Sequence, residues 1–434
     1  MKPTSQGGPD DHPREPSAGR LRRLALRALG LLAVAAFLVY AARRGGHRGN
    51  DFKYFYGASR LYWSTGELHV RSQPRYPITF HVLLVPLARL PIGVAAAIWA
   101  VLSAAAVAVL PGLIGRLSGV GPRRQVWAWA LVAPFFIDAI ALGQGDPLNI
   151  ALATAGLLLA RQGRGFSGTA TIGLAAMIKI LPIVQWATVL SRRRTPGVFA
   201  GMAATAVVGL AVLVVAVGWG PALEALRQQY EWVRDMEKPW HLVARGGDLR
   251  PNNESLPIVL ARTLGAIPEA YRPARVPVLA RLPLGAIWAA WYAALSAVGV
   301  AWLASVRPAG RLDPGRGWLG MFALTSIVML AATPICWHHY FLWTLPAAVF
   351  LAHRPRLLAT LAALSLAGSA SHAARGLGCH MILALGLFAA VVREIRRESR
   401  DLGSSTDVGP VPIGVGTLAP TPYHPPGPAA DAPE

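Results

Sequence analysis

The sequence contains few cysteines and few charged residues for its length. Only 15% of its 434 residues are charged, and its two cysteines are Cys336 and Cys379. Two cysteines without metal-ligand spacing exclude a disulfide framework and a cysteine zinc motif, so we expect both to be packing residues. A 54% share of hydrophobic residues exceeds what one soluble core can bury. The composition therefore predicts an all-α, polytopic integral membrane protein.

Lysine is also scarce, and the basic charge is carried almost entirely by arginine. The chain has 38 arginines, four lysines and a formal net charge of +21. In a soluble protein this charge would indicate a nucleic-acid partner. Here the arginines lie between apolar segments, so we interpret them as markers of membrane topology and predict membrane lipids, and no nucleic acid, as partners.

Apolar windows predict about twelve transmembrane helices. The fifth and sixth are shorter than the ~20 residues that a bilayer requires, so we expect them to be tilted, bent or paired partway across. The first window lacks a clear cleavage site and is expected to remain as an anchor. The predicted spans are residues 24–42, 92–114, 125–142, 147–161, 168–180, 181–191, 196–218, 283–306, 317–334, 338–352, 355–371 and 376–392.

The arginines orient these spans. If the amino terminus is cytoplasmic, every turn on that side is basic, as the positive-inside rule requires. A transmembrane domain over residues 24–393 then has outer loops at 43–91 and 219–282, and the first loop ends in a proline-interrupted apolar stretch, typical of a helix lying in the interface. Residues 1–19 and 401–434 are rich in Pro, Gly, Ser and Ala, so we expect disordered cytoplasmic tails over residues 1–23 and 394–434.

This topology gathers polar residues from five regions at the outer face of a multi-pass cell-membrane protein. Because loops are generally polar, each residue alone has an ordinary explanation. Their convergence is nevertheless what a functional site needs. The set is Asp51, Gln144, Asp146, Lys179, Asn253, Ser255, His338 and His339.

Two aspartates in this set have competing interpretations. Asp51 follows the first span and could act as a general base, although it could also cap the helix that begins near Phe52 or pair with Arg48. Asp146 precedes Pro147, an arrangement typical of a helix start, so we favour a capping role for it.

Lys179 lies in an apolar stretch, and a lysine at the bilayer centre costs ~2.5–3.5 kcal/mol. It could extend its ammonium group along the helix end to water, or present it to an anionic group such as a lipid phosphate.

His338 and His339 could donate to a phosphate or exchange a proton. Adjacent residues on an α-helix point about 100° apart, so only one is expected to face the site. No carboxylate lies beside them at helical spacing, so we predict no metal site.

Taken together, these motifs resemble glycosyltransferase family 87, the GT-C-fold group that includes polyprenol-phosphate-mannose-dependent α-mannosyltransferases. The resemblance covers residues 51–352 and lies in the order and spacing of the motifs. This chain departs from the common family residue at four positions. It has Ile78 in place of Pro, Asp146 in place of Asn, Glu254 in place of Gln, and Trp337 in place of an acidic residue. The motifs are Asp51-Phe-x-x-Phe-Tyr-x-Ala, Tyr76-Pro77, Pro86-Leu, Leu90-Pro91, Gly143-Gln144, Gly173-Leu-Ala-Ala-x-x-Lys179-x-x-Pro182, Asn253-x-Ser255-Leu and Trp337-His338-His339.

The resemblance implies a metal-independent, inverting transfer of a hexose, with mannose preferred. The donor would be a polyprenyl-phosphate sugar acting as co-substrate without a further cofactor, and the acceptor a hydroxyl of a cell-envelope glycolipid or glycan at the outer face. Asp51 would be the general base. Residues expected to bind the donor phosphate are Lys179, His338, His339 and Arg48, and those expected to bind substrate are Tyr54, Tyr56, Tyr76, Gln144, Asn253 and Ser255.

Two other classes of protein stay open at this point. In a twelve-span transporter, the intramembrane lysine and the histidines would bind substrate or relay protons. A non-catalytic lipid-binding or scaffold protein could have kept the same fold. Transporters place their sites near the midplane, whereas the polar residues here are expected at one face, which favours the enzyme.

Overall fold

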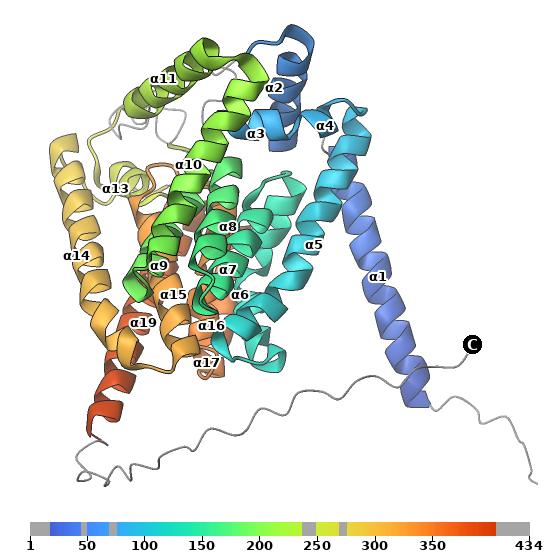
Figure 1. Cartoon of the computed structure of the whole chain (residues 1–434). Helices are drawn as coiled ribbons and strands as arrows, with labels where there is room; N and C mark the ends of the chain where they lie inside the picture. Colours follow the sequence, from blue (N-terminus) through green and yellow to red (C-terminus); the bar gives the residue numbers. More distant parts are fainter. Residues whose placement is uncertain (1–17, 45–49, 69–75, 237–248, 269–275, 405–434) are drawn as a thin grey trace, which may run out of the picture.

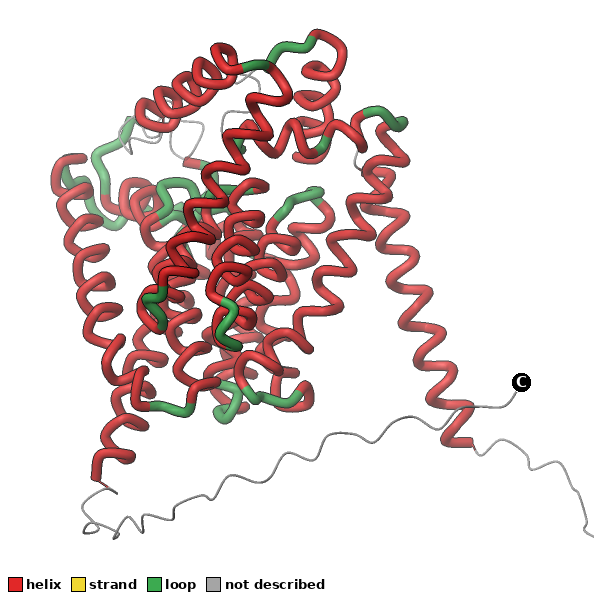
Figure 2. The backbone as a smooth tube through the Cα atoms, in the orientation of Figure 1, coloured by secondary structure: helices red, strands yellow, loops and turns green. Residues whose placement is uncertain are grey.

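The computed structural model describes residues 18–44, 50–68, 76–236, 249–268 and 276–404. These residues form eighteen α-helices and two 3-10 helices, with two isolated β-bridges and no longer strand. Figure 2 shows the helices gathered into one bundle, with short loops at its two ends. The parts of the predicted tails at residues 1–17 and 405–434 lie outside the described residues.

Nine helices of fourteen residues or more form the body of the bundle. A tenth, α1 (Ala18–Arg44), stands at its edge beside α5 (Figure 1). The nine are α5 (Ile92–Ser118), α6 (Pro122–Ala141), α7 (Asp146–Arg161), α8 (Gly165–Ile178), α10 (Pro196–Val217), α14 (Leu284–Arg311), α15 (Pro314–Ala332), α17 (Pro355–Ala370) and α19 (Cys379–Ser404).

The core of the bundle is built around α15, whose side chains are buried along almost its whole length. Phe322 and Leu324 of α15 pack in one apolar cluster with Phe135 of α6, Leu157 of α7 and Val391 of α19. Because apolar packing continues on every side of α15, this helix fixes the positions of its neighbours.

The outer surface of the bundle is apolar as well. Val215 of α10 is 87% exposed, and Val300 and Leu303 of α14 are 65% and 64% exposed. Exposed aliphatic side chains on helices whose backbone groups are satisfied internally suit a hydrocarbon surrounding. Among the described residues, α5, α10, α14 and α15 are long and apolar enough to cross a membrane. The chain is therefore an integral multi-pass membrane protein.

Several shorter helices interrupt the bundle. At residues 181–192 the chain continues from α8 through a 3-10 helix into a short α-helix, so the short fifth and sixth windows form a bent pair, as one of the expected alternatives had it. A second break follows α15, and a third follows α17. The helices at these breaks are η2 (Leu181–Val184), α9 (Gln185–Arg192), η5 (His338–Thr344), α16 (Leu345–Phe350) and α18 (His372–Gly376).

A group of helices covers one end of the bundle (Figure 1). The proline-interrupted stretch at 76–91 forms two very short helices in place of the single interfacial helix expected there. The two predicted outer loops contain three more helices. These helices are α2 (Asp51–Thr65), α3 (Ile78–Leu83), α4 (Val85–Ala88), α11 (Trp219–Met236) and α13 (Leu256–Leu264).

The helix boundaries differ from the prediction mainly at the two ends of the chain. The last helix continues to Ser404, eleven residues past the predicted end of the membrane domain at 393. In this extension, oppositely charged residues lie three positions apart on the helix, and Nη2 of Arg397 is 2.5 Å from Oε1 of Glu394. The first helix begins at Ala18, six residues before the predicted start.

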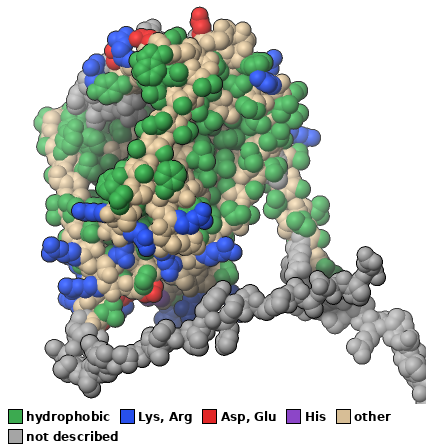
Figure 3. All heavy atoms as spheres, in the orientation of Figure 1, with side chains coloured by type: hydrophobic (Ala, Val, Ile, Leu, Met, Phe, Trp, Pro, Cys, Tyr) green, Lys and Arg blue, Asp and Glu red, His purple; other side chains and the backbone are tan. Residues whose placement is uncertain are grey.

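Basic side chains gather at the end of the bundle opposite α2 and α11. On the face in Figure 3, most Lys and Arg side chains form a band below a wide apolar region. This distribution matches the arginine-rich turns that the sequence places on one side of the membrane.

Contact between α7 and α8 depends on two small residues. A Cβ atom on Gly168 would lie 2.7 Å from the carbonyl oxygen of Gly156 and 2.8 Å from the Cβ of Ala160. Distances this short force the two helices apart.

We therefore expect Gly168→Ala to destabilise the protein by about 1–3 kcal/mol, the usual cost of overpacking. The check is a lower unfolding temperature of the purified protein in detergent. Gly299→Ala in α14 is the control, because an added Cβ there has nothing within 4 Å. Equal unfolding temperatures for the two variants would contradict close packing of α7 on α8.

Candidate functional site

A cavity of about 420 Å³ opens at the end of the bundle covered by α2. Its walls come from α2, the turn between α6 and α7, the segment before α13, the start of η5, and α18. The lining residues are Asp51, Tyr54, Phe55, Tyr76, Asp138, Leu142, Gln144, Arg250, Asn252, Trp337, His338, His339, Tyr340 and Arg375.

Asp51 is held at the first turn of α2 with its carboxylate directed into the cavity. The helix is capped by Asn50, whose Oδ1 accepts a hydrogen bond from the N–H of Phe52 at 2.9 Å. The alternative that Asp51 caps this helix is therefore wrong. Its side chain instead accepts a short hydrogen bond from Nε2 of Gln144. Arg48, the other suggested partner, lies outside the described residues.

The start of α2 is fastened to the turn between α6 and α7. The backbone N–H of Asp51 donates to the carbonyl of Leu142 at 3.0 Å. The next residue, Gly143, has a φ of +69°, and a Cβ there would lie 2.6 Å from the Cβ of Phe52. Only glycine permits both this backbone conformation and this close approach.

The surroundings of Asp51 alter its acidity. Burial raises the pKa of the Asp51 carboxyl above its ordinary value, because desolvation penalises the charged form. His339, Lys179 and the Gln144 hydrogen bond act in the opposite direction and limit that rise. The result is a carboxylate that binds protons more readily than an exposed aspartate.

Behind the cavity, Asp146 and Lys179 form a buried ion pair. Nζ of Lys179 lies 2.8 Å from Oδ2 of Asp146, and both side chains are at most 4% exposed. The expected capping role of Asp146 is wrong, since Gly145 occupies the N-cap position and Asp146 turns into the core. Lys179 does not extend to water either, which removes that alternative.

Tyr340 links this ion pair to the cavity. Its ring lies 3.7 Å from Nζ of Lys179, a distance suited to a cation–π contact. Tyr340 lines the cavity while Lys179 does not. The Tyr340 ring thus lies between the Lys179 ammonium group and the cavity, and the lysine does not contact the cavity itself.

Both adjacent histidines line the cavity, so the expectation that only one of them faces it is wrong. The reason is that His338 begins a 3-10 helix instead of lying within a regular α-helix. Nδ1 of His338 lies 3.3 Å from Oδ2 of Asp138, and Nδ1 of His339 lies 3.8 Å from the same oxygen. One carboxylate therefore faces both rings.

Asn253 and Ser255 are buried and support the histidine segment without lining the cavity. Oδ1 of Asn253 accepts from the N–H of Cys336 at 3.0 Å, and Oγ of Ser255 donates to the carbonyl of Pro334 at 2.7 Å. The N–H of His338 donates to the carbonyl of Asn252 at 3.2 Å. This loop fixes the backbone from which the histidines project.

The three predicted tyrosines take different positions. Tyr54 and Tyr76 line the cavity, and the hydroxyl of Tyr76 donates to Oε1 of Gln144 at 2.5 Å. Tyr56 points away from it into an aromatic cluster, where its hydroxyl donates to the carbonyl of Leu90 at 2.8 Å.

The sequence analysis did not single out four charged or aromatic residues of the cavity: Asp138, Arg250, Tyr340 and Arg375. Asp138 carries a signal that could have found it, because a single carboxylate in the apolar run 126–142 requires a partner. The other three have no distinguishing local pattern.

Beside the histidines lies a group of potential metal ligands from Glu254, Cys379 and His380, with ligand atoms within 4.8 Å of one another. Nδ1 of His380 is 2.7 Å from Oε1 of Glu254. A tetrahedral zinc ion would hold two such ligand atoms about 3.3 Å apart, given metal–ligand distances near 2.0–2.1 Å. The group as it stands is a hydrogen-bonded pair with a thiol beside it, and it braces the loop before α13 against α19.

Residues 75–334, more than half of the chain, match glycosyltransferase family 87. The chain belongs to this family. Family 87 implies the GT-C membrane fold, which agrees with the all-helical architecture of the described residues. The protein is thus a family 87 glycosyltransferase, and the transporter alternative loses its basis.

A distant relative is a polyprenol-phosphate-mannose-dependent alpha-(1-2)-phosphatidylinositol pentamannoside mannosyltransferase of Mycolicibacterium smegmatis. It is 26% identical over 358 residues, which cover 79% of this chain and 79% of the relative. No solved structure matches the family 87 chain described here.

The buried Lys179–Asp146 ion pair can be tested by substitution. Lys179→Met leaves the Asp146 carboxylate buried without a cation, so we expect a loss of about 3–5 kcal/mol of unfolding free energy. Adding Asp146→Asn removes the unpaired charge and should recover much of that loss. Thermal unfolding in detergent measures both, and a double variant less stable than the single one would contradict mutual neutralisation.

Proposed function

We propose that this family 87 glycosyltransferase moves a hexose, with mannose preferred, from a polyprenyl-phosphate donor to a hydroxyl of a cell-envelope glycolipid or glycan. The observation that carries the proposal is the position of Asp51, a desolvated carboxylate in a cavity that also contains two histidines. The relative that uses polyprenol-phosphate-mannose supports the choice of donor.

The reaction is a single displacement with inversion at the anomeric carbon. The acceptor oxygen bonds to that carbon while the bond from the carbon to the phosphate oxygen breaks, and the lipid phosphate leaves with the bonding electrons. Asp51 accepts the acceptor proton, and its raised pKa makes it a better base than an exposed aspartate. The inverting geometry needs the base and the phosphate on opposite sides of the sugar.

The departing phosphate requires donors and positive charge. His338, His339 and Arg375 line the cavity and are suited to this role. Lys179 would contribute through Tyr340 and by neutralising Asp146, since it does not line the cavity itself. Arg48 remains a candidate from outside the described residues. The substrate-binding role passes to Tyr54, Tyr76 and Gln144, with Tyr56, Asn253 and Ser255 positioning the walls.

We further propose that the cavity faces the extracytoplasmic side. The described basic side chains gather at the opposite end of the bundle, and the positive-inside rule assigns such an end to the cytoplasm. Each predicted span overlaps helical residues, but 181–191 and 338–352 each consist of a 3-10 helix followed by a short α-helix. Four helices of the described residues have the length and hydropathy of a complete span. In this arrangement residues 24–393 form one catalytic membrane domain.

Replacing Asp51 by Asn removes the base and keeps the shape of the side chain. We expect transfer of radiolabelled mannose from polyprenyl-phosphate mannose to a membrane glycolipid fraction to fall by about 10²–10⁴-fold, the usual contribution of a general base. Lys53→Gln is the control, because Lys53 is exposed on the same helix. If Asp51→Asn retains the wild-type rate, another group must accept the proton.

The pH dependence of transfer tests the environment of the same carboxylate. A base must be ionised, so activity should decline as the pH falls through the raised pKa of Asp51. Gln144→Leu removes a hydrogen bond that lowers this pKa. The pKa should rise further and the acid limb of the pH–rate profile should move to higher pH. Tyr76→Phe retains the Gln144 donor and should move the limb less. A shift of the acid limb to lower pH in Gln144→Leu would contradict the assignment.

A further inference from the structure

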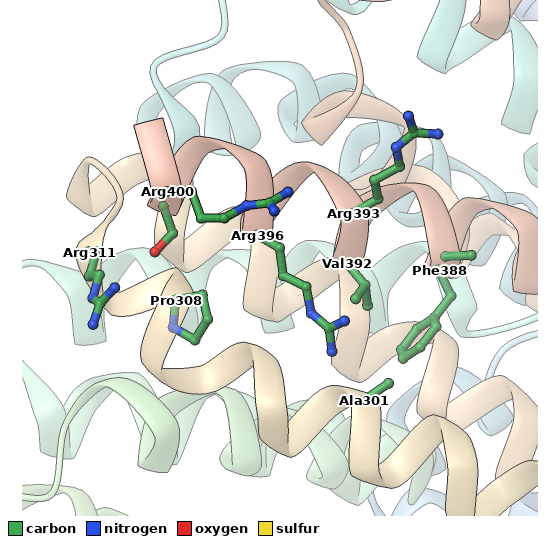
Figure 4. A pocket seen from close by; sticks show the side chains of 10 residues that line it. Ala301, Pro308, Arg311, Phe388, Val392, Arg393, Arg396 and Arg400 are labelled. Carbon is green, nitrogen blue, oxygen red and sulfur yellow. The ribbon is translucent and has the colours of Figure 1, made fainter. Parts of the chain in front are cut away.

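A second cavity, larger than the one at Asp51, lies far from that residue, in a groove between α14 and α19. It has a volume of about 700 Å³ and sits near the carboxyl ends of both helices, at the basic end of the bundle. Figure 4 shows apolar side chains lining the groove and arginines projecting around them. The lining residues are Ala301, Pro308, Arg311, Phe388, Ala389, Val392, Arg393, Arg396, Ser399 and Arg400.

The two kinds of side chain follow from the helical spacing of α19. Phe388, Val392 and Arg396 are four residues apart and share one face, so that face changes from apolar to basic along the helix. Arg393 and Arg400 flank it, and Arg311 approaches from α14. A ligand in this groove would therefore meet hydrocarbon beside Phe388 and Val392 and guanidinium groups toward Arg396 and Arg400.

These four arginines differ from their neighbours in having no acidic partner among the described residues. The adjacent Arg397 pairs with Glu394 at 2.5 Å, and Arg316 pairs with Glu398 at 2.6 Å. Glu394 and Glu398 of α19 are thus already engaged by arginines outside the groove. The four groove arginines are exposed and together carry four uncompensated positive charges.

The groove also lies where a lipid headgroup would be. α14 fits a membrane span, and its exposed Val300 and Leu303 lead along the outer surface toward the groove. On α19, Ile382 is 64% exposed and precedes the basic residues by about three turns. Acyl chains could follow these apolar side chains while a phosphate contacts the arginines at the boundary.

We propose that this groove binds an anionic phospholipid of the leaflet at the basic end of the bundle. Guanidinium groups bind phosphate oxygens through paired hydrogen bonds, and the apolar floor accommodates the first methylenes of the acyl chains. Soluble phosphate could contact the guanidinium groups but would leave the apolar floor of the groove unfilled. The bound lipid would join α14 to α19, the helix that begins next to the histidines of the catalytic cavity.

The test compares two lipids with identical acyl chains. Full-length protein is purified in detergent and titrated with dioleoyl phosphatidylglycerol or dioleoyl phosphatidylcholine, with bound lipid counted by native mass spectrometry and unfolding temperature recorded in parallel. We expect tighter binding of phosphatidylglycerol and a higher unfolding temperature with it. Equal affinity for the two lipids overturns the proposal.

Matched variants locate the site. Each arginine near a membrane surface contributes about fivefold to the binding of anionic lipid, so Arg393→Gln combined with Arg396→Gln should weaken binding about 25-fold. Arg123→Gln combined with Arg124→Gln removes the same charge from exposed positions outside the groove and should change binding less than about twofold. Equal losses in both double variants would indicate general surface attraction and overturn the assignment.

A control with soluble anions distinguishes binding of a lipid from binding of a free anion. Inorganic phosphate and glycerophosphoglycerol carry the headgroup chemistry without acyl chains, and we expect neither to raise the unfolding temperature at concentrations where phosphatidylglycerol does. A rise equal to that from the lipid would mean that the groove is a soluble-anion site.

Discussion

Burying charge in an apolar bundle requires that each charge have a partner, and the Lys179–Asp146 pair meets this requirement at the centre of the site. Their atoms are 2.8 Å apart with both side chains excluded from solvent. The same carboxylate lies 3.7 Å from Nε2 of His339, and His339 in turn faces Asp138. A change in any of these four groups alters the electrostatic surroundings of the others, so their positions are determined together.

This constraint explains why the site forms where helices end. Helix ends release backbone groups that need partners, and in a membrane they can exist only where other protein groups supply them. Gln144 lies in the turn between α6 and α7, Lys179 ends α8, and His338 starts η5 after the break that follows α15. Each break leaves backbone N–H and C=O groups without helical partners, and residues at the neighbouring breaks form hydrogen bonds with them. Two departures from the family motifs also have partners in the fold. Glu254 pairs with His380. Trp337 replaces the acidic residue that is more common in the family, and Asp138 supplies a carboxylate beside the histidines instead.

The predictability of these features depended on whether the signal was local. Long apolar runs such as 92–114 and 283–306 became helices with nearly the expected bounds, because burial and helix length determine them directly. Asp146 was misassigned because Asp-Pro at a helix start is an ordinary cap pattern, whereas its partner Lys179 is 33 residues away. A search for apolar windows does not find the helix at 219–236, because charged residues cover one face of this amphipathic helix. Asp138 stands out as a lone carboxylate in an apolar run, but its partners His338 and His339 are about 200 residues away and are known only from the fold. The family motifs thus indicated the cavity, and tertiary contacts decided which motif residues line it.

The missing side chain at Gly143 has a consequence for how this membrane domain can vary. Because Gly143 lets the first turn of α2 dock on the Leu142 carbonyl, the α6–α7 turn sets the position of Asp51. A side chain at position 143 would separate α2 from this turn and move the carboxylate away from Gln144. A substitution there would therefore alter the cavity, although residue 143 does not line it.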